Sequence, residues 1–216
     1  MKIAVLGAAR RPGLEIVAEA EKQGIGVTCV ISDASVIPGS GPVIIKDPGE
    51  LESADFAGCH AVVDALSFPE IGAFSSEELP LWHVLEILKG TQTKVVCLGA
   101  ASCLYSDESR SERLLESSCV THADHEQGLR LCATAFKRLA SERGTPWTLL
   151  CPPLILDPDG QATGRFEFAG DVLPMALDGS SYISGLDFAR AAVELLLRGP
   201  KPYEVISVSG MMSSRA

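Results

Sequence analysis

A turn near the start of the chain has the spacing of a phosphate-binding loop. Gly7 and Gly13 fit a G-x-x-G-x-x-G pattern whose middle position is Arg10. Between a buried strand and a helix, such glycines permit a sharp bend and let the backbone approach a pyrophosphate, which the helix N-terminus attracts. An arginine in the middle either binds phosphate from a displaced position or weakens the site. The turn predicts a dinucleotide site, although any strand–turn–helix connection can begin with glycine.

The two residues that follow the second expected strand can influence which dinucleotide binds. Ser32 and Asp33 follow the apolar run 27–31. A carboxylate about 20 residues beyond the glycine turn accepts a hydrogen bond from a ribose 2′-hydroxyl and repels a 2′-phosphate, which favours NAD. Asp33 could equally cap a turn with Ser35. Both interpretations stay open at this point.

Cys119, His122 and His125 have a three-residue spacing that deserves a test as a metal site. The two histidines would share one face of a first helical turn. A structural zinc usually needs a fourth ligand from a convergent segment, and the sequence shows none. The pattern therefore predicts histidines on a solvated helix start, with no metal.

These residues must be positioned by alternating strands and helices. Apolar runs predict strands, and amphipathic segments with helix start and stop signals predict helices between them. This alternation predicts an α/β fold with a mostly parallel sheet. The expected strands are 3–6, 27–31, 43–45, 61–63, 94–98, 147–151 and 203–208, and the expected helices are 12–24, 75–89, 121–144 and 184–198.

The last third of the chain departs from this alternation. The segment 152–181 is rich in glycine, aspartate and proline, and 165–168 alternates as a short edge strand would. We expect residues 152–183 to form an inserted cap over a site. No linker divides the chain, so 1–216 is expected to be a single domain.

Composition limits the classes of function. The chain has 216 residues, 46% of them apolar, and a formal charge of −10, which disfavours nucleic-acid binding. Its seven cysteines are dispersed with no Cys-x-x-Cys pair, which predicts a reducing, cytoplasmic setting. No run approaches the ~18 apolar residues of a membrane span. The expected partner is a small-molecule substrate, without nucleic acid or membrane, and a homodimer is compatible with the sequence.

In the order and spacing of its motifs, the chain resembles the atypical short-chain dehydrogenase/reductases, specifically the small NAD(P)H-binding proteins known as NADH-flavin reductases. This resemblance implies a doubly wound Rossmann-like sheet, NAD(P) at the carboxyl ends of the strands, and a small C-terminal substrate region. The family commonly has glycine where Arg10 stands. The motifs that carry the resemblance are 1–9, 59–67, 98–105, 147–153, 164–166, 170–173 and 183–189.

The resemblance extends the set of expected cofactor-binding residues beyond the glycine turn. In similar proteins an arginine at the position of Arg11 often holds the 2′-phosphate, which favours NADP, with NAD as the alternative. The full expected set is Gly7, Ala9, Arg10, Arg11, Pro12, Gly13, Ser32, Asp33, Ala65, Leu66, Ser67, Pro152 and Pro153.

Ser102 and Tyr105 are the candidate catalytic residues. Ser102 follows the fifth expected strand, where related reductases place a serine, and Tyr105 is the nearest phenol. The sequence contains no Tyr-x-x-x-Lys pair, and Tyr105 could instead be a partly buried tyrosine with a satisfied hydroxyl. Reduction of a flavin needs no sharply placed proton donor, so the missing pair is compatible with a reductase.

The expected function is hydride transfer from NAD(P)H to a small planar acceptor, which is a flavin, a quinone or a carbonyl compound. FMN or FAD would then be a substrate. One alternative is a non-catalytic protein that senses NAD(P) or regulates a partner. A second alternative, an epimerase-like enzyme acting on a nucleotide sugar, is disfavoured by the short substrate region and the missing Tyr-x-x-x-Lys pair.

Overall fold

An eight-stranded sheet forms the centre of the part of the chain that the structure describes. The structure is a computed structural model, and it describes residues 1–68, 75–116, 123–176 and 179–210. The strands of this sheet are β1 (Lys2–Leu6), β2 (Gly26–Ile31), β3 (Val43–Ile45), β4 (Ala61–Asp64), β5 (Lys94–Leu98), β6 (Trp147–Cys151), β8 (Phe166–Ala169) and β10 (Glu204–Gly210).

The strand order is β3-β2-β1-β4-β5-β6-β10-β8. Neighbouring strands from β3 to β10 pair in parallel, and β8 pairs antiparallel with β10 at the edge. The chain winds outward from β1 to β3 and then returns to β4 to wind the other way. This confirms the predicted doubly wound, mostly parallel sheet, with its switch point between β1 and β4.

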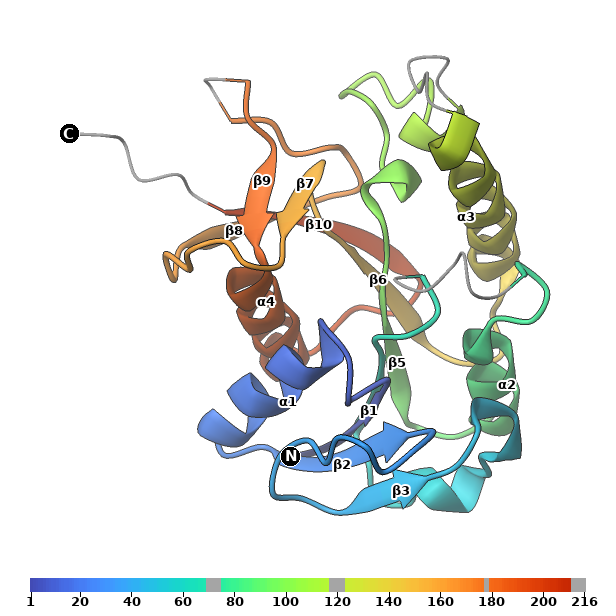
Figure 1. The fold of residues 1–216 in the computed structure, drawn as a ribbon. Coiled ribbons are helices and arrows are strands. Elements are labelled where there is room, and N and C mark those ends of the chain that lie inside the picture. Colours follow the sequence, from blue (N-terminus) through green and yellow to red (C-terminus); the bar gives the residue numbers. More distant parts are fainter. Residues whose placement is uncertain (69–74, 117–122, 177–178, 211–216) are drawn as a thin grey trace.

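Helices cover both faces of this sheet (Figure 1). One face carries α1 (Gly13–Lys22) and α4 (Gly185–Arg198), and the other carries α2 (Pro80–Ile87) and α3 (Ala123–Ser141). Within the described ranges, no helix is both long enough and apolar enough to cross a membrane.

The continuous apolar run of β1 follows from its burial on both faces. Ile3 and Val5 pack in the core beneath α1 and α4, while Ala4 and Leu6 pack in the core beneath α2 and α3. Since successive side chains of a strand point to opposite faces, a strand covered on both sides needs apolar residues at every position.

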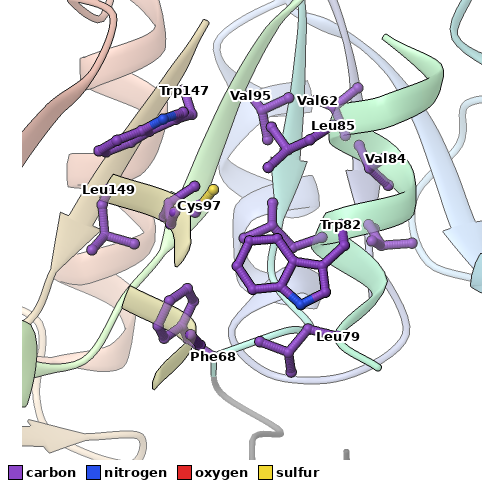
Figure 2. Close-up of a cluster of buried hydrophobic side chains, with 14 of the residues drawn as sticks. Val62, Phe68, Leu79, Trp82, Val84, Leu85, Val95, Cys97, Trp147 and Leu149 are labelled. Atoms are coloured by element: carbon purple, nitrogen blue, oxygen red, sulfur yellow. The ribbon is translucent and has the colours of Figure 1, made fainter. Parts of the chain in front are cut away.

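Figure 2 shows the core beneath α2 and α3. Leu85 of α2 lies near Val62 and Val95, and Trp82 lies lower in the view, toward Leu79. The Trp82 indole donates a hydrogen bond to the carbonyl of Ser76 at 2.7 Å, which satisfies its buried N–H. This packing fixes α2 beside the carboxyl ends of β4 and β5.

The start of α2 differs from the sequence expectation. The Ser75 hydroxyl donates to Glu78 Oε2 at 2.8 Å, but this pair belongs to a turn, and the helix begins at Pro80. Leu79 is extended, with φ −57° and ψ 131°. A residue before proline is pushed out of the helical region by the proline ring, so a helix from 75 could not continue through 79 and 80.

The predicted start of α4 is confirmed. The Ser184 hydroxyl accepts a hydrogen bond from the backbone N–H of Asp187 at 3.2 Å. The buried Asp187 carboxylate in turn accepts from the backbone N–H groups of Thr163 at 2.7 Å and Gly164 at 2.9 Å. The helix start therefore holds the loop before β8.

The segment 152–183 contains elements that the sequence did not reveal. The short strands β7 (Ile155–Asp157) and β9 (Tyr182–Ser184) form a separate parallel pair. The expected edge strand is present as β8, which pairs with β10 at the edge of the main sheet. Strands of three residues are too short for alternation to identify.

The packing of α4 generates a stability prediction. Phe188 is fully buried between α4 and the sheet, so Phe188→Ala should lower the free energy of unfolding by about 3–5 kcal/mol. Leu197→Ala, on an exposed position of the same helix, should change it by less than about 1 kcal/mol. Urea unfolding followed by circular dichroism measures both. Equal losses in the two variants would contradict the assigned burial of α4.

Candidate functional site

A cavity of about 270 Å³ opens at the carboxyl ends of β1, β2 and β3. Its size is near the lower end of small-molecule sites, and its position beside the switch point is where doubly wound sheets bind ligands. The lining residues are Leu6, Gly7, Ala9, Arg10, Val30, Ile31, Ser32, Asp33, Lys46, Asp47, Pro48 and Leu66.

The glycine turn at the edge of this cavity has no room for a side chain at Gly7 or at Gly13. Gly7 has φ +77°, and a Cβ on it would lie 3.2 Å from the Leu66 Cβ and 3.3 Å from the Ala65 carbonyl oxygen. A Cβ on Gly13 would lie only 2.4 Å from the carbonyl oxygen of Gly7. The first turn of α1 can therefore pack directly on the end of β1, as the predicted phosphate-binding turn requires, with Pro12 immediately before the helix.

The two arginines of the turn go in different directions. Arg10 lines the cavity near Asp33. Arg11 does not: its Nη1 donates to Asp159 Oδ1 at 2.6 Å and to the Pro158 carbonyl at 3.0 Å, and its Nε pairs with Glu15 at 3.1 Å. The structure thus places Arg10, and not Arg11, beside the residues that follow β2.

Ser32 and Asp33 both line the cavity, as expected. The Asp33 carboxylate also accepts from the backbone N–H of Ser35 at 2.8 Å, so the turn-capping alternative holds as well. Hydrogen bonds from Ser35, and to a lesser degree the charge of Arg10, lower the pKa of Asp33. Asp33 therefore presents an ionised carboxylate at the end of β2.

The residues that follow β3 were not foreseen as part of the site. Lys46, Asp47 and Pro48 line the cavity from the side opposite the glycine turn. The signal was available in the sequence, because residues directly after every strand of a parallel sheet gather at one edge. Lys46 carries a cation to this edge, and its ammonium is bound by Asp55.

The turn after β4 lies against the glycine turn. Ala65 and Ser67 are buried, and Leu66 reaches the cavity. Asp64 organises this turn, since its Oδ1 accepts from the backbone N–H of Leu66 at 3.1 Å and of Ser67 at 3.0 Å. The Ser67 hydroxyl accepts from the Leu81 N–H at 3.0 Å, which joins the turn to the start of α2.

Asp64 itself is a buried carboxyl that the sequence analysis did not single out. Burial raises its pKa, against the opposing hydrogen bonds of Ser67 and Leu66. Its Oδ2 is buried and, among the residues that the structure describes, has no hydrogen-bond partner. The group is therefore more easily protonated in the folded chain than in the unfolded one.

Ser102 and Tyr105 lie beyond the cavity, after β5. Ser102 belongs to a short 3₁₀ helix (Ala101–Cys103), and its hydroxyl is buried with no hydrogen-bond partner in the described part of the chain. Tyr105 is fixed by backbone hydrogen bonds with Asp171 and Leu173, and the Arg113 guanidinium lies 3.9 Å from its ring centroid.

Pro152 and Pro153 are buried directly after β6, on the same edge of the sheet as Ser102 and Leu66. The expected site residues thus fall into two groups. Gly7, Ala9, Arg10, Ser32, Asp33 and Leu66 line the cavity, whereas Ser102, Tyr105, Pro152 and Pro153 follow β5 and β6 outside it.

These residues fit a dinucleotide. The glycine turn packs the start of α1 on the end of β1, where a helix N-terminus attracts a phosphate group, and Asp33 with Ser32 can receive ribose hydroxyls. The Arg10 side chain lines the cavity near β2.

Among the described side chains, no group of three or more histidine, cysteine, aspartate or glutamate residues could hold a metal ion. Cys119 and His122 lie outside the described residues, as does the side chain of His125.

The crowding at Gly13 generates a binding prediction. Gly13→Ala should weaken NADH binding at least tenfold, because the added Cβ must push the start of α1 away from the Gly7 carbonyl. Gly49→Ala, beside the same cavity, adds a Cβ with no atom within 4 Å and should leave binding unchanged. Calorimetric titration of both folded variants measures this. Undiminished affinity in Gly13→Ala would show that the turn does not hold the dinucleotide.

The buried Asp64 carboxyl should make the free energy of unfolding depend on pH. Because the pKa of Asp64 is raised in the folded state, its contribution to stability is lost as pH rises through that value. Asp64→Asn keeps an acceptor for Leu66 and Ser67 and removes the buried charge, so it should raise the free energy of unfolding more at pH 8 than at pH 4.

Asp107→Asn is the matched control for this change. Asp107 is exposed, and hydrogen bonds from Ser109 lower its pKa, so its replacement should bring no gain at high pH. Urea unfolding across the pH range compares the two. The same pH profile in both variants would rule out a special role for the burial of Asp64.

Comparison with known proteins places these features in a family. No family model matches the chain. The uncharacterised protein YwnB of Bacillus subtilis (strain 168) is 32% identical over 209 residues, which cover 91% of this chain and 92% of YwnB.

Solved structures agree with this relationship. SP1627 of Streptococcus pneumoniae TIGR4, by name a "putative NADH-flavin reductase", has a TM-score of 0.88 at 29% identity, covering 98% of this chain and 100% of SP1627. A Lactobacillus casei protein has a TM-score of 0.83 at 26% identity, covering 98% of this chain and 100% of its own. The chain therefore belongs, with YwnB, to the NADH-flavin reductase-like family of atypical short-chain dehydrogenase/reductases, proteins with an NAD(P)-binding Rossmann-like fold.

Proposed function

We propose that the protein is an NAD(P)H-dependent oxidoreductase that reduces a small planar acceptor, namely a flavin, a quinone or a carbonyl compound. The observation that carries this proposal is the cavity beside the crowded glycine turn, which has the position and lining of the adenosine end of a dinucleotide site. The similarity to SP1627, which is named for NADH-flavin reductase activity, supports the same class of reaction.

The chain would bind the dinucleotide along one edge of the sheet. The cavity over β1 to β3 holds the adenosine end, and the start of α1 attracts the pyrophosphate. Ser102 and Pro152 follow β5 and β6 on that edge and would orient the nicotinamide end. The bound cofactor supplies the hydride, and the protein supplies position and electrostatics.

Ser102 and Tyr105 are the proposed hydrogen-bond donors to the acceptor. The Ser102 hydroxyl is buried without a partner in the described chain, so donating to an acceptor oxygen would satisfy it. Tyr105 is held in place through its backbone and the Arg113 guanidinium. A carbonyl acceptor needs such donors because negative charge develops on its oxygen during reduction.

For the cofactor we propose NADH in preference to NADPH. The argument for NADP rested on Arg11, whose guanidinium is bound to Glu15 and Asp159 and does not line the cavity. Asp33 does line it and carries a carboxylate that would receive a ribose 2′-hydroxyl and repel a 2′-phosphate.

A second candidate function is dinucleotide sensing without turnover. The absence of a Tyr-x-x-x-Lys pair from the sequence favours it, since that pair is the usual proton donor of related reductases. In a sensor, NADH would bind at the same cavity and change the affinity for a partner.

Turnover assays separate these two functions. We expect the purified protein to oxidise NADH when given FMN, a quinone such as menadione, or a small aldehyde. Ser102→Ala and Tyr105→Phe should slow carbonyl reduction by about a hundredfold, because a proton donor is lost, and flavin reduction by less than about threefold.

Equal slowing for both kinds of acceptor would mean that these residues only shape the site. NADH that binds with no oxidation above the buffer rate, across all three acceptor classes, would replace the reductase proposal with the sensor.

A further inference from the structure

We infer that the ion pair between Lys46 and Asp55 contributes to the cofactor preference, because it withholds from a 2′-phosphate one of the two cations that line the adenosine cavity, the other being Arg10. Asp55 lies outside the cavity and would act only through Lys46, as a positioning residue. This inference rests on the proposed function, since it assumes that the cavity receives the adenosine end of the dinucleotide.

The Lys46 ammonium contacts both carboxylate oxygens of Asp55 at short distance. Lys46 Nζ lies 2.9 Å from both carboxylate oxygens of Asp55. Asp55 is in turn fixed by the backbone N–H of Glu52, which donates to its Oδ2 at 2.7 Å. The side chains are 35% and 15% exposed, so water screens this pair less than a pair on the open surface.

The chain segment between the two residues explains how they meet. Lys46 follows β3 directly, and Asp55 lies in a short 3₁₀ helix (Ser53–Phe56) whose Phe56 is fully buried. Burial of Phe56 anchors this helix against the sheet, so Asp55 is held at one place beside the strand end. The ammonium therefore faces a fixed carboxylate and not a mobile one.

Charges around the cavity add to this effect. Among the cavity-lining residues, Arg10 and Lys46 are cations, while Asp33 and Asp47 are carboxylates. Counting Asp55 with Lys46 makes the surroundings of the cavity acidic by one charge. The hydrogen bond to Asp55, together with the charges of Asp55 and its acidic neighbours, also raises the pKa of Lys46.

A 2′-phosphate and a 2′-hydroxyl would respond differently to these surroundings. The phosphate carries negative charge and must either displace Asp55 from Lys46 or accept repulsion from the nearby carboxylates. The hydroxyl is neutral and can donate to a carboxylate. With Asp55 in place, Lys46 thus contributes little to NADPH binding, and the cavity accepts NADH.

Calorimetric titration with NADH and with NADPH tests this inference. Asp55→Asn keeps an oxygen for the Glu52 N–H but removes the charge that binds Lys46. We expect it to raise NADPH affinity at least tenfold, about 1.4 kcal/mol, and to change NADH affinity less than about twofold. Adding Lys46→Gln to this variant should abolish the gain.

Two single variants complete the design. Glu52→Gln removes one negative charge near Lys46 while leaving the Asp55 contact intact, so it should shift NADPH affinity by less than about twofold. Lys46→Gln in the otherwise natural chain leaves the Asp55 carboxylate uncompensated and should weaken NADPH binding, but by less than about threefold, because the ammonium is already bound by Asp55. Thermal melts show which variants are folded, and the Lys46→Gln result does not depend on Asp55→Asn being stable.

Several results would overturn the inference. A tenfold loss of NADPH affinity in Lys46→Gln would show that this residue already binds the phosphate. Equal gains in Asp55→Asn and Glu52→Gln would indicate a general charge effect, and no gain in a folded Asp55→Asn would exclude the pair as the determinant. If the natural chain binds NADH while any of these results is found, the inference fails but the proposed function remains supported. If the natural chain binds neither NADH nor NADPH, the inference and the proposed function both fail.

Discussion

The rest of the site depends on the contact between the first turn of α1 and the end of β1. A Cβ on Gly13 would lie 2.4 Å from the Gly7 carbonyl oxygen, so the helix can start here only without a side chain. A Cβ on Gly7 would lie 3.2 Å from the Leu66 Cβ and 3.3 Å from the Ala65 carbonyl oxygen, which ties the turn after β4 to the same point. One crowded position thus aligns the helix start, the switch point of the sheet and the cavity beside them.

Parallel topology concentrates polar groups at that edge. Each strand from β1 to β6 brings its last residue and the residues after it to the same edge of the sheet, and these include Asp33, Lys46, Asp64 and Ser102. The interior strands are almost wholly apolar, so polar chemistry is confined to strand ends and to the turns that follow. The arrangement separates stability, which resides in the two cores, from binding, which resides at the edge.

Arg11 shows how the C-terminal segment joins this edge. Its contacts with Asp159 and Pro158 connect the glycine turn to the chain after β7, and Asp187 holds the following loop at Gly164. An arginine that family resemblance assigns to a phosphate is instead part of a connection between the cofactor side and the 152–183 segment. Arg10, one residue earlier, takes the place beside Asp33.

The strands of the main sheet, most helix ends and the glycine turn could be predicted from the sequence. Strands follow from local hydrophobic periodicity, helix ends from capping residues, and the glycine turn from the backbone freedom of glycine. Only the tertiary structure decided which arginine lines the cavity, that Lys46 belongs to it, that Asp55 binds Lys46, and that Asp64 is buried. The start of α2 lay in the sequence, at Pro80, but the capping pattern at Ser75 obscured it. The physical reason for this division is that periodicity and caps act between residues a few positions apart. The direction of a long charged side chain is instead set by partners far along the chain, such as Asp159 for Arg11.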